Sequence, residues 1–209
     1  EIMWQFQQAV KGMGDACKFF DIPVVSGNVS LYNETKGDAI YPTPTVAVVG
    51  LIENQDKVMT QGFKKSGDQI AIIGFTKDEL GGTEYLKVMF DCSEGKPPVL
   101  DRKNEQKVQS FCWELIQKEL ISSAHDCSEG GLAVAVAESC FSPGCETLGA
   151  SLMIESTLRN DSLLFGETQS RIIVSFSKEQ INAIKDLAKD FSVDFSLIGI
   201  VGGSHLTIT

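Results

Sequence analysis

Residues 69–209 alternate between short runs of β-branched residues and longer stretches with apolar residues at helical spacing. This alternation restricts the fold more than any other feature, since it predicts an α/β or α+β domain. We expect strands at 69–74, 121–125, 150–154, 171–176, 195–201 and 206–209. We expect helices around 85–89 and at 101–120, 132–139, 163–167 and 178–190. Ser177 is the expected cap of the last helix.

The first part of the chain has a different pattern. Residues 1–20 carry apolar side chains at helical spacing from the outset, which predicts a helix. Because no capping residue precedes this pattern and the first residue is not Met, we expect a fragment of a longer protein. Strands are expected at 23–26 and Thr45–Ile52, the second with both faces buried. Residues 33–44 are expected to be a polar connection, and residues 53–68 a linker or short helix between domains.

Composition limits the functional classes. The 209 residues carry a formal net charge of −10, which argues against a nucleic-acid surface but not against a nucleotide site. The length suits one large domain, or one domain plus part of another. We find no run of 18 apolar residues and no signal peptide, so we expect neither a membrane span nor secretion.

The six cysteines are scattered and form no Cys-x-x-Cys pair. With only two histidines, a zinc site is poorly supported. We therefore expect reduced cysteines in a cytosolic protein, some of them in the core. These cysteines are Cys17, Cys92, Cys112, Cys127, Cys140 and Cys145.

Residues 26–30 read Ser-Gly-Asn-Val-Ser and follow the expected strand at 23–26. Gly27 would let the backbone approach a ligand closely, because it has no Cβ. Asn28 offers an amide oxygen that can ligate a hard cation such as Mg²⁺, and Ser30 offers a hydroxyl to a phosphate or sugar oxygen. An ordinary polar turn between two strands explains the same residues equally well.

Residues 125–132 read His-Asp-Cys-Ser-Glu-Gly-Gly-Leu and place an acid and two glycines at a strand-to-helix junction. Such a junction can bind an anion through helix N-terminal amides, or Asp126 and Glu129 could hold a metal. Alternatively, the two glycines only allow close packing of helix and sheet. A nucleophilic pair of His125 and Cys127 is the least favoured interpretation of these residues.

Two weaker patterns remain. Glu167, Gln169 and Arg171 alternate, so in an extended segment they share one face and could read a polar ligand or cap a solvated strand. Residues 81–84 read Gly-Gly-Thr-Glu before a helix, which could receive a phosphate. The match to a P-loop fails, however, because no Gly-Lys-Ser/Thr follows.

Taken together, three strings resemble one family. They are Ser-Gly-Asn-Val-Ser-Leu-Tyr-Asn-Glu at 26–34, His-Asp-Cys-Ser-Glu-Gly-Gly-Leu at 125–132 and Phe-Gly-Glu-Thr-Gln-Ser-Arg at 165–171. Over about residues 1–209 the chain resembles the C-terminal part of the large, synthetase subunits of the phosphoribosylformylglycinamidine synthase (FGAM synthase) family. The first string is highly specific, whereas the other two recur loosely in a superfamily that includes aminoimidazole ribonucleotide synthetase.

The resemblance implies a cytoplasmic, ATP- and Mg²⁺-dependent carbon–nitrogen ligase of de novo purine biosynthesis. ATP would phosphorylate the amide oxygen of formylglycinamide ribonucleotide, and ammonia would then displace phosphate to form the amidine. The implied partners are a glutaminase that releases ammonia from glutamine and a small bridging subunit. As a fragment, the chain is expected to be inactive alone.

The resemblance also implies a fold and site residues. Residues 1–60 would be the C-terminal part of an aminoimidazole-ribonucleotide-synthetase-like N-terminal domain, and 65–209 a complete synthetase-like C-terminal α/β domain. Gly27 would lie against ATP, Asn28 would ligate Mg²⁺ and Ser30 would contact the ribonucleotide. No catalytic residue is expected in this part of the enzyme. An auxiliary site that could hold a structural nucleotide would be lined by Asp126, Glu167 and Gln169.

Two alternatives stay open. The chain could be a non-catalytic scaffold that docks the partner subunits, or it could come from another ATP-dependent member of the superfamily, such as aminoimidazole ribonucleotide synthetase. A metal-capable Asn beside Gly favours the ligase over the scaffold. An incomplete first domain should also expose an apolar face, so we expect self-association.

Overall fold

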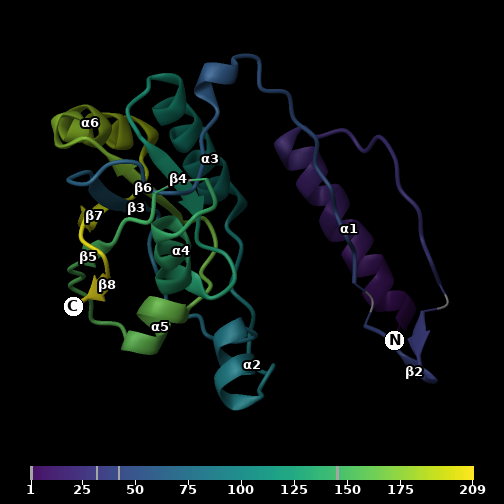
Figure 1. The fold of residues 1–209 in the computed structure, drawn as a ribbon. Helices are drawn as coiled ribbons and strands as arrows, with labels where there is room; N and C mark the ends of the chain where they lie inside the picture. The colour runs from purple at the N-terminus through teal and green to yellow at the C-terminus, as the bar shows by residue number, and fades with distance from the viewer. Residues whose placement is uncertain (1, 32, 42, 145) are drawn as a thin grey trace. The chain divides into compact units, whose positions relative to one another are not determined.

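A computed structural model describes residues 2–31, 33–41, 43–144 and 146–209 (Figure 1). Glu1, Tyr32, Pro42 and Cys145, which contributed to the sequence-based expectations, lie outside the described residues. The chain divides into two compact units, residues 1–51 and 52–209, which are described separately. Among the described helices, none has the length and apolarity needed to cross a membrane.

The first unit contains the expected N-terminal helix, α1 (Ile2–Phe20), none of whose residues is buried. The helix ends where Asp21 takes a left-handed conformation with φ 55°. Two short strands, β1 (Glu34–Thr35) and β2 (Asp38–Ala39), then form a hairpin. Lys36 and Gly37 both have positive φ at its tip, as a tight two-residue hairpin turn requires.

The two strands expected in this unit are wrong. Residues 23–26 and 45–52 have no regular secondary structure, and the side chain of Val49 is 96% exposed where burial on both faces was expected. The physical reason is the lack of a partner. A β-strand is stabilised by hydrogen bonds to a neighbouring strand, and within the described part of residues 1–51 no other chain segment pairs with either run.

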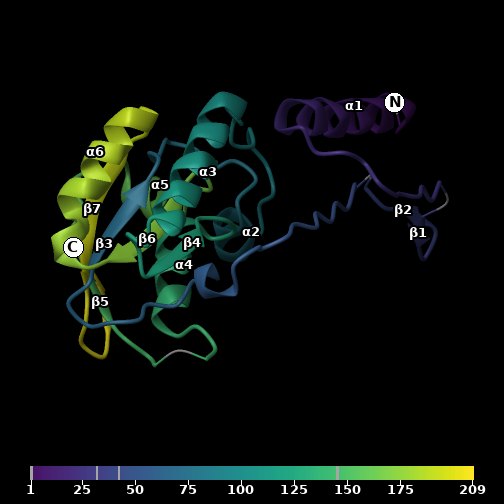
Figure 2. The ribbon, with the colours of Figure 1, turned by 90° about the horizontal axis from the view of Figure 1, so that it is seen from above.

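The second unit is built on a six-stranded sheet in the order β4-β6-β3-β7-β5-β8. All pairs are antiparallel except β5 and β8, which are parallel. Figure 2 shows β7, β3, β6 and β4 in sequence across the sheet. The strands are β3 (Gln69–Ile73), β4 (Ser123–Asp126), β5 (Ala150–Leu152), β6 (Ile172–Phe176), β7 (Phe195–Val201) and β8 (Leu206–Ile208).

Helices cover both faces of this sheet, because its central strands are apolar on both sides. Ala71 and Ile73 of β3 pack with α3 and α6, whereas Ile70 and Ile72 pack with α4. In Figure 1, α3 and α6 lie toward the top of this unit and α4 lies below them. The helices are α2 (Glu84–Phe90), α3 (Arg102–Gln117), α4 (Gly131–Cys140), α5 (Asn160–Phe165) and α6 (Ile181–Phe191). The expected class of mixed helices and sheet is confirmed.

Local capping signals explain some of the helix boundaries. Asp101 caps α3, since its Oδ1 accepts hydrogen bonds from the amides of Lys103 and Asn104 at 3.0 and 3.1 Å. The expected cap at Ser177 is wrong. This residue precedes a 3-10 turn (Lys178–Gln180), and its hydroxyl donates to the Glu179 carboxylate instead of capping a backbone amide. A second 3-10 turn, Gln55–Lys57, lies in the expected connection at 53–68.

Candidate functional site

The Ser-Gly-Asn-Val-Ser loop lies in the first unit, between α1 and β1, and Gly27, Asn28 and Ser30 are exposed. A Cβ added to Gly27 would meet no atom within 4 Å. The described part of this unit therefore gives no packing reason for a glycine here. Its local contact is a hydrogen bond from the side-chain amide of Asn33 to the Ser30 carbonyl oxygen, at 3.0 Å.

The chemistry of this loop fits the ligands implied by the resemblance. The Asn28 side chain makes no hydrogen bond within the described residues, so its amide oxygen can accept a cation. One amide oxygen supplies only one of the oxygen ligands that Mg²⁺ needs, so other groups must complete the site. The roles of Gly27, Asn28 and Ser30 stay predictions.

In the second unit, a carboxylate bridges the starts of two helices. Oε1 of Glu167 accepts hydrogen bonds from the amide of Gly130, at the start of α4, and from that of Glu84, the first residue of α2, both at 2.9 Å. An anionic acceptor at helix N-termini is electrostatically favoured. The amide of Gly130, which could have received an external anion in one of the alternatives for the 125–132 junction, is therefore bound by the protein's own carboxylate.

The two glycines of this junction are explained by packing. Gly130 and Gly131 have φ of 79° and 68°, which side-chain-bearing residues rarely adopt. A Cβ on Gly131 would lie 2.6 Å from the carbonyl oxygen of Gly166. Among the alternatives left open by the sequence, these contacts favour a tight turn that lets α4 approach the segment after α5.

Arg171 holds the segment that carries Glu167. The residue is buried, with 2% of its surface exposed. Its guanidinium donates to the carbonyl oxygens of Thr168 (2.8 Å) and Gly166 (2.6 Å) and to Oγ1 of Thr76 (3.0 Å). Burial lowers the pKa of Arg171, and nearby Cys127, Glu79 and Glu167 raise it. All three acceptors are neutral oxygens, so the guanidinium forms no direct ion pair with a described carboxylate.

The structure places the three predicted auxiliary-site residues differently. The Asp126 side chain is 72% exposed at the end of β4, and Gln169 is exposed, with its side-chain amide 3.4 Å from the Glu167 carbonyl oxygen. Glu167 is half-buried and bound to the two helix starts. Across the described ranges, no three His, Cys, Asp or Glu side chains form a group that could hold a metal. The auxiliary site stays a prediction.

His125 and Cys127 lack the features of a nucleophilic pair. Nε2 of His125 lies 2.8 Å from a carboxylate oxygen of Glu138, on α4. Cys127 is buried, and burial raises the pKa of its thiol to about 11. The thiol is therefore protonated at neutral pH, and a protonated thiol is a poor nucleophile.

The sequence analysis missed the polar contacts that fasten the 78–99 segment. Ser162 donates to the Asp78 carboxylate, and Glu79 Oε1 accepts from the amide of Val99 at 3.1 Å. Oε2 of Glu79 is buried with no hydrogen-bond partner in the described structure. The one feature of the sequence that pointed to these contacts was the acidic pair Asp78-Glu79. Gly81 itself packs against the backbone of Lys96, where a Cβ would lie 2.2 Å from the carbonyl oxygen, which gives the glycine pair a structural role.

Two family descriptions match the chain. Residues 65–209 match the C-terminal domain of the AIR synthase related proteins, and residues 1–52 match the N-terminal domain of the same proteins. Among curated relatives, the PurL subunits of phosphoribosylformylglycinamidine synthase from Anaeromyxobacter sp. (strain K) and Moorella thermoacetica are 47% and 46% identical over 100% of the chain. The chain spans 28% of the length of each relative.

Solved structures agree on the fold. Thermotoga maritima PurL in complex with FGAR covers 74% of the chain with a TM-score of 0.62 and 20% identity, and 27% of that protein is matched. The same protein in complex with ATP covers 74% with a TM-score of 0.59 and 19% identity, and 25% of it is matched. The resemblance to FGAM synthases drawn from the three strings is thus confirmed by the relatives. Because one family description covers more than half of its residues, the chain belongs to the AIR synthase related protein family.

Proposed function

We propose that this chain is part of an ATP-dependent carbon–nitrogen ligase that converts formylglycinamide ribonucleotide, ammonia from glutamine and ATP into formylglycinamidine ribonucleotide, ADP and phosphate. The observation that carries this proposal is 47% identity along the whole chain to a PurL subunit. The ligands named for Thermotoga maritima PurL, ATP and FGAR, are those the proposed reaction uses. The reaction belongs to purine biosynthesis and would take place in the cytoplasm.

The exposed loop of the first unit would supply the binding groups. Gly27 leaves space for ATP, Asn28 offers its amide oxygen to Mg²⁺, and Ser30 donates its hydroxyl to the ribonucleotide. When bound, Mg²⁺ neutralises charge on the transferring phosphoryl group. The contribution of the chain is to position these groups on one short segment, which limits the orientations open to the reactants.

The domain division follows the proposed relationship. Residues 1–60 would belong to the N-terminal type of domain and 65–209 to the C-terminal type, in the second of two similar halves of the enzyme. In the proposed auxiliary nucleotide site, Asp126 and Gln169 are exposed and can reach a ligand. Glu167 would act by fixing the turn beside Asp126, since its Oε1 is already bound to two amides.

The proposed partners are a glutaminase and a small bridging subunit, and a docking role for this half is the second candidate function. The observation that favours it is the exposure of apolar side chains in the first unit, such as Val25 and Val49. Where such side chains form a contiguous apolar patch, the patch marks a surface that another protein segment covers. Binding and catalysis are compatible, so the experiment must separate them.

The test uses a full-length subunit that contains this chain, with Asn28→Ala or Ser30→Ala. Ammonia-dependent amidine formation and ADP release are measured across a Mg²⁺ titration. We expect Asn28→Ala to raise the Mg²⁺ concentration needed for half-maximal rate, and Ser30→Ala to raise KM for the ribonucleotide. Ser204→Ala, an exposed serine of the second unit, is the matched control. Wild-type kinetics in both loop variants would leave the docking role as the better description.

A further inference from the structure

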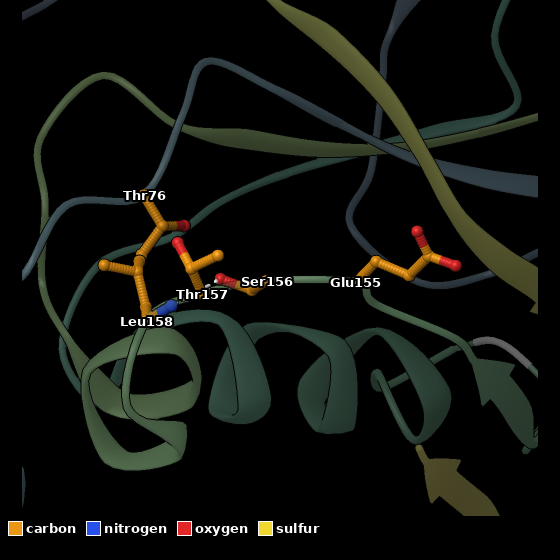
Figure 3. Close-up of a pocket in the computed structure, with 5 residues that line it drawn as sticks. All are labelled: Thr76, Glu155, Ser156, Thr157 and Leu158. Atoms are coloured by element: carbon orange, nitrogen blue, oxygen red, sulfur yellow. Dashed lines mark hydrogen bonds between the residues drawn. The ribbon is translucent and has the colours of Figure 1, made fainter.

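The second unit contains an open polar pocket that none of the roles above uses. It has a volume of about 630 Å³ and is lined by Thr76, from the segment after β3, and by residues 155–158, from the segment between β5 and α5. Figure 3 shows the hydroxyls of Thr76 and Thr157 turned toward each other, with Glu155 at the far end. The lining therefore presents three hydroxyl-bearing side chains and one carboxylate.

The hydroxyls are arranged to donate. Oγ1 of Thr76 already accepts a hydrogen bond from Arg171 at 3.0 Å, and Oγ of Ser156 accepts one from the amide of Leu158 at 3.1 Å. Each of these two hydroxyls accepts one hydrogen bond, and neither donates its proton to another described residue. The proton of each hydroxyl can therefore be donated to a ligand. The backbone amides of Ser156 and Thr157 also donate to no acceptor in the described structure.

A positive charge lies behind one of these donors, Thr76. The buried guanidinium of Arg171 bonds directly to the Thr76 hydroxyl, and its other bonds go to carbonyl oxygens. A hydroxyl polarised by a cation is a stronger donor, and a buried charge acts across a short distance with little screening. Acceptor-rich anions are the ligands that satisfy unused donors next to such a charge.

We propose that this pocket binds a phosphate-type oxyanion through the Thr76, Ser156 and Thr157 hydroxyls. The site is independent of the loop at 26–30 and does not rest on the proposed function. The negative charge of Glu155 repels an anion from its own end of the pocket. Its carboxylate can, however, accept a hydrogen bond from a sugar hydroxyl. The ligand is therefore either free phosphate or the phosphate of a phosphomonoester whose hydroxyls reach Glu155.

The first experiment titrates the full 209-residue chain with inorganic phosphate at constant ionic strength and follows backbone amides by NMR. We expect saturable shifts of the amides of Thr76 and residues 155–158. Thr157→Val removes a hydroxyl that makes no hydrogen bond within the described protein, so the fold should persist while phosphate binding weakens about tenfold. Thr207→Val, the same change at an exposed position on β8, should leave binding unchanged.

The second experiment distinguishes the sources of the phosphate. Ribose 5-phosphate binds more tightly than inorganic phosphate if a phosphomonoester is the ligand, and Glu155→Gln then removes part of that gain. Equal binding of the two identifies free phosphate. The proposal is overturned if no saturable shift is seen at up to about 20 mM phosphate, or if Thr157→Val and Thr207→Val bind phosphate equally well.

Discussion

Two runs of similar sequence adopt different structures in this molecule, one a buried strand and the other an exposed irregular segment. Residues 69–73 form the central strand β3, with Ile70 and Ile73 fully buried, whereas residues 45–52 have no regular secondary structure and are exposed. Both runs are rich in β-branched residues, so local propensity does not separate them. What differs is pairing, since β3 lies between β6 and β7 and the other run pairs with no described strand. Strand formation here is decided by neighbours that the local sequence does not contain.

The largest expected effect comes from changing one side chain in each run. Ile70→Ala removes a fully buried side chain from the core and should lower the free energy of unfolding by roughly 3 kcal/mol. Val49→Ala, at a side chain that is 96% exposed, should change it by less than about 0.5 kcal/mol. Urea unfolding of the 209-residue chain measures both. Equal losses would mean that residues 45–52 are packed in solution.

A second large effect is expected at Arg171. Arg171→Met keeps much of the side-chain volume but leaves the carbonyl oxygens of Gly166 and Thr168 without their donors. Buried unpaired acceptors are costly, so we expect a loss of roughly 2–4 kcal/mol. Arg159→Met, at an exposed arginine paired with Asp161, is the control and should cost less than about 1 kcal/mol. A similar small loss at Arg171 would show that water replaces the guanidinium.

The sequence predicted the second unit better than the first, for the same reason. All six strands of the sheet were expected near their observed positions, because their apolar side chains pack into the two cores of this same unit. The strands at 23–26 and 45–52 were wrong, because the pattern specifies burial but not the partner that provides it. At the site, the sequence singled out Glu167 as a candidate ligand-binding residue, but its bonds to Gly130 and Glu84 join segments far apart in sequence. No local spacing indicates such contacts.

An intermediate effect is expected from pH. Burial raises the pKa of the Cys112 and Cys127 thiols from 9.0 to about 11. Between these values the unfolded chain loses protons that the folded chain keeps, so stability should fall as pH rises from 9 toward 11. At pH 10 the loss is roughly 1 kcal/mol for each thiol. In urea unfolding at pH 8 and pH 10, Cys112→Ala/Cys127→Ala should show a smaller difference than the wild-type chain. An equal difference would assign the pH dependence to other groups.

The smallest expected effect concerns hydrogen bonds between distant segments. In the second unit, Glu167 bonds to the starts of α4 and α2, whereas residues 23–26 of the first unit have no such bonds among the described residues. Glu167→Ala removes the acceptor shared by the amides of Gly130 and Glu84. A lost helix cap costs about 1 kcal/mol, so hydrogen exchange of these two amides should accelerate about fivefold. Glu94→Gln, at an exposed carboxylate in the same 78–99 region, should leave both rates unchanged. If exchange at Gly130 accelerates while Glu84 is unaffected, the carboxylate fastens α4 alone and α2 is held by the Asp78 and Glu79 contacts. Unchanged exchange at both amides would mean that the close packing of Gly131 against Gly166, not the carboxylate, orders the start of α4.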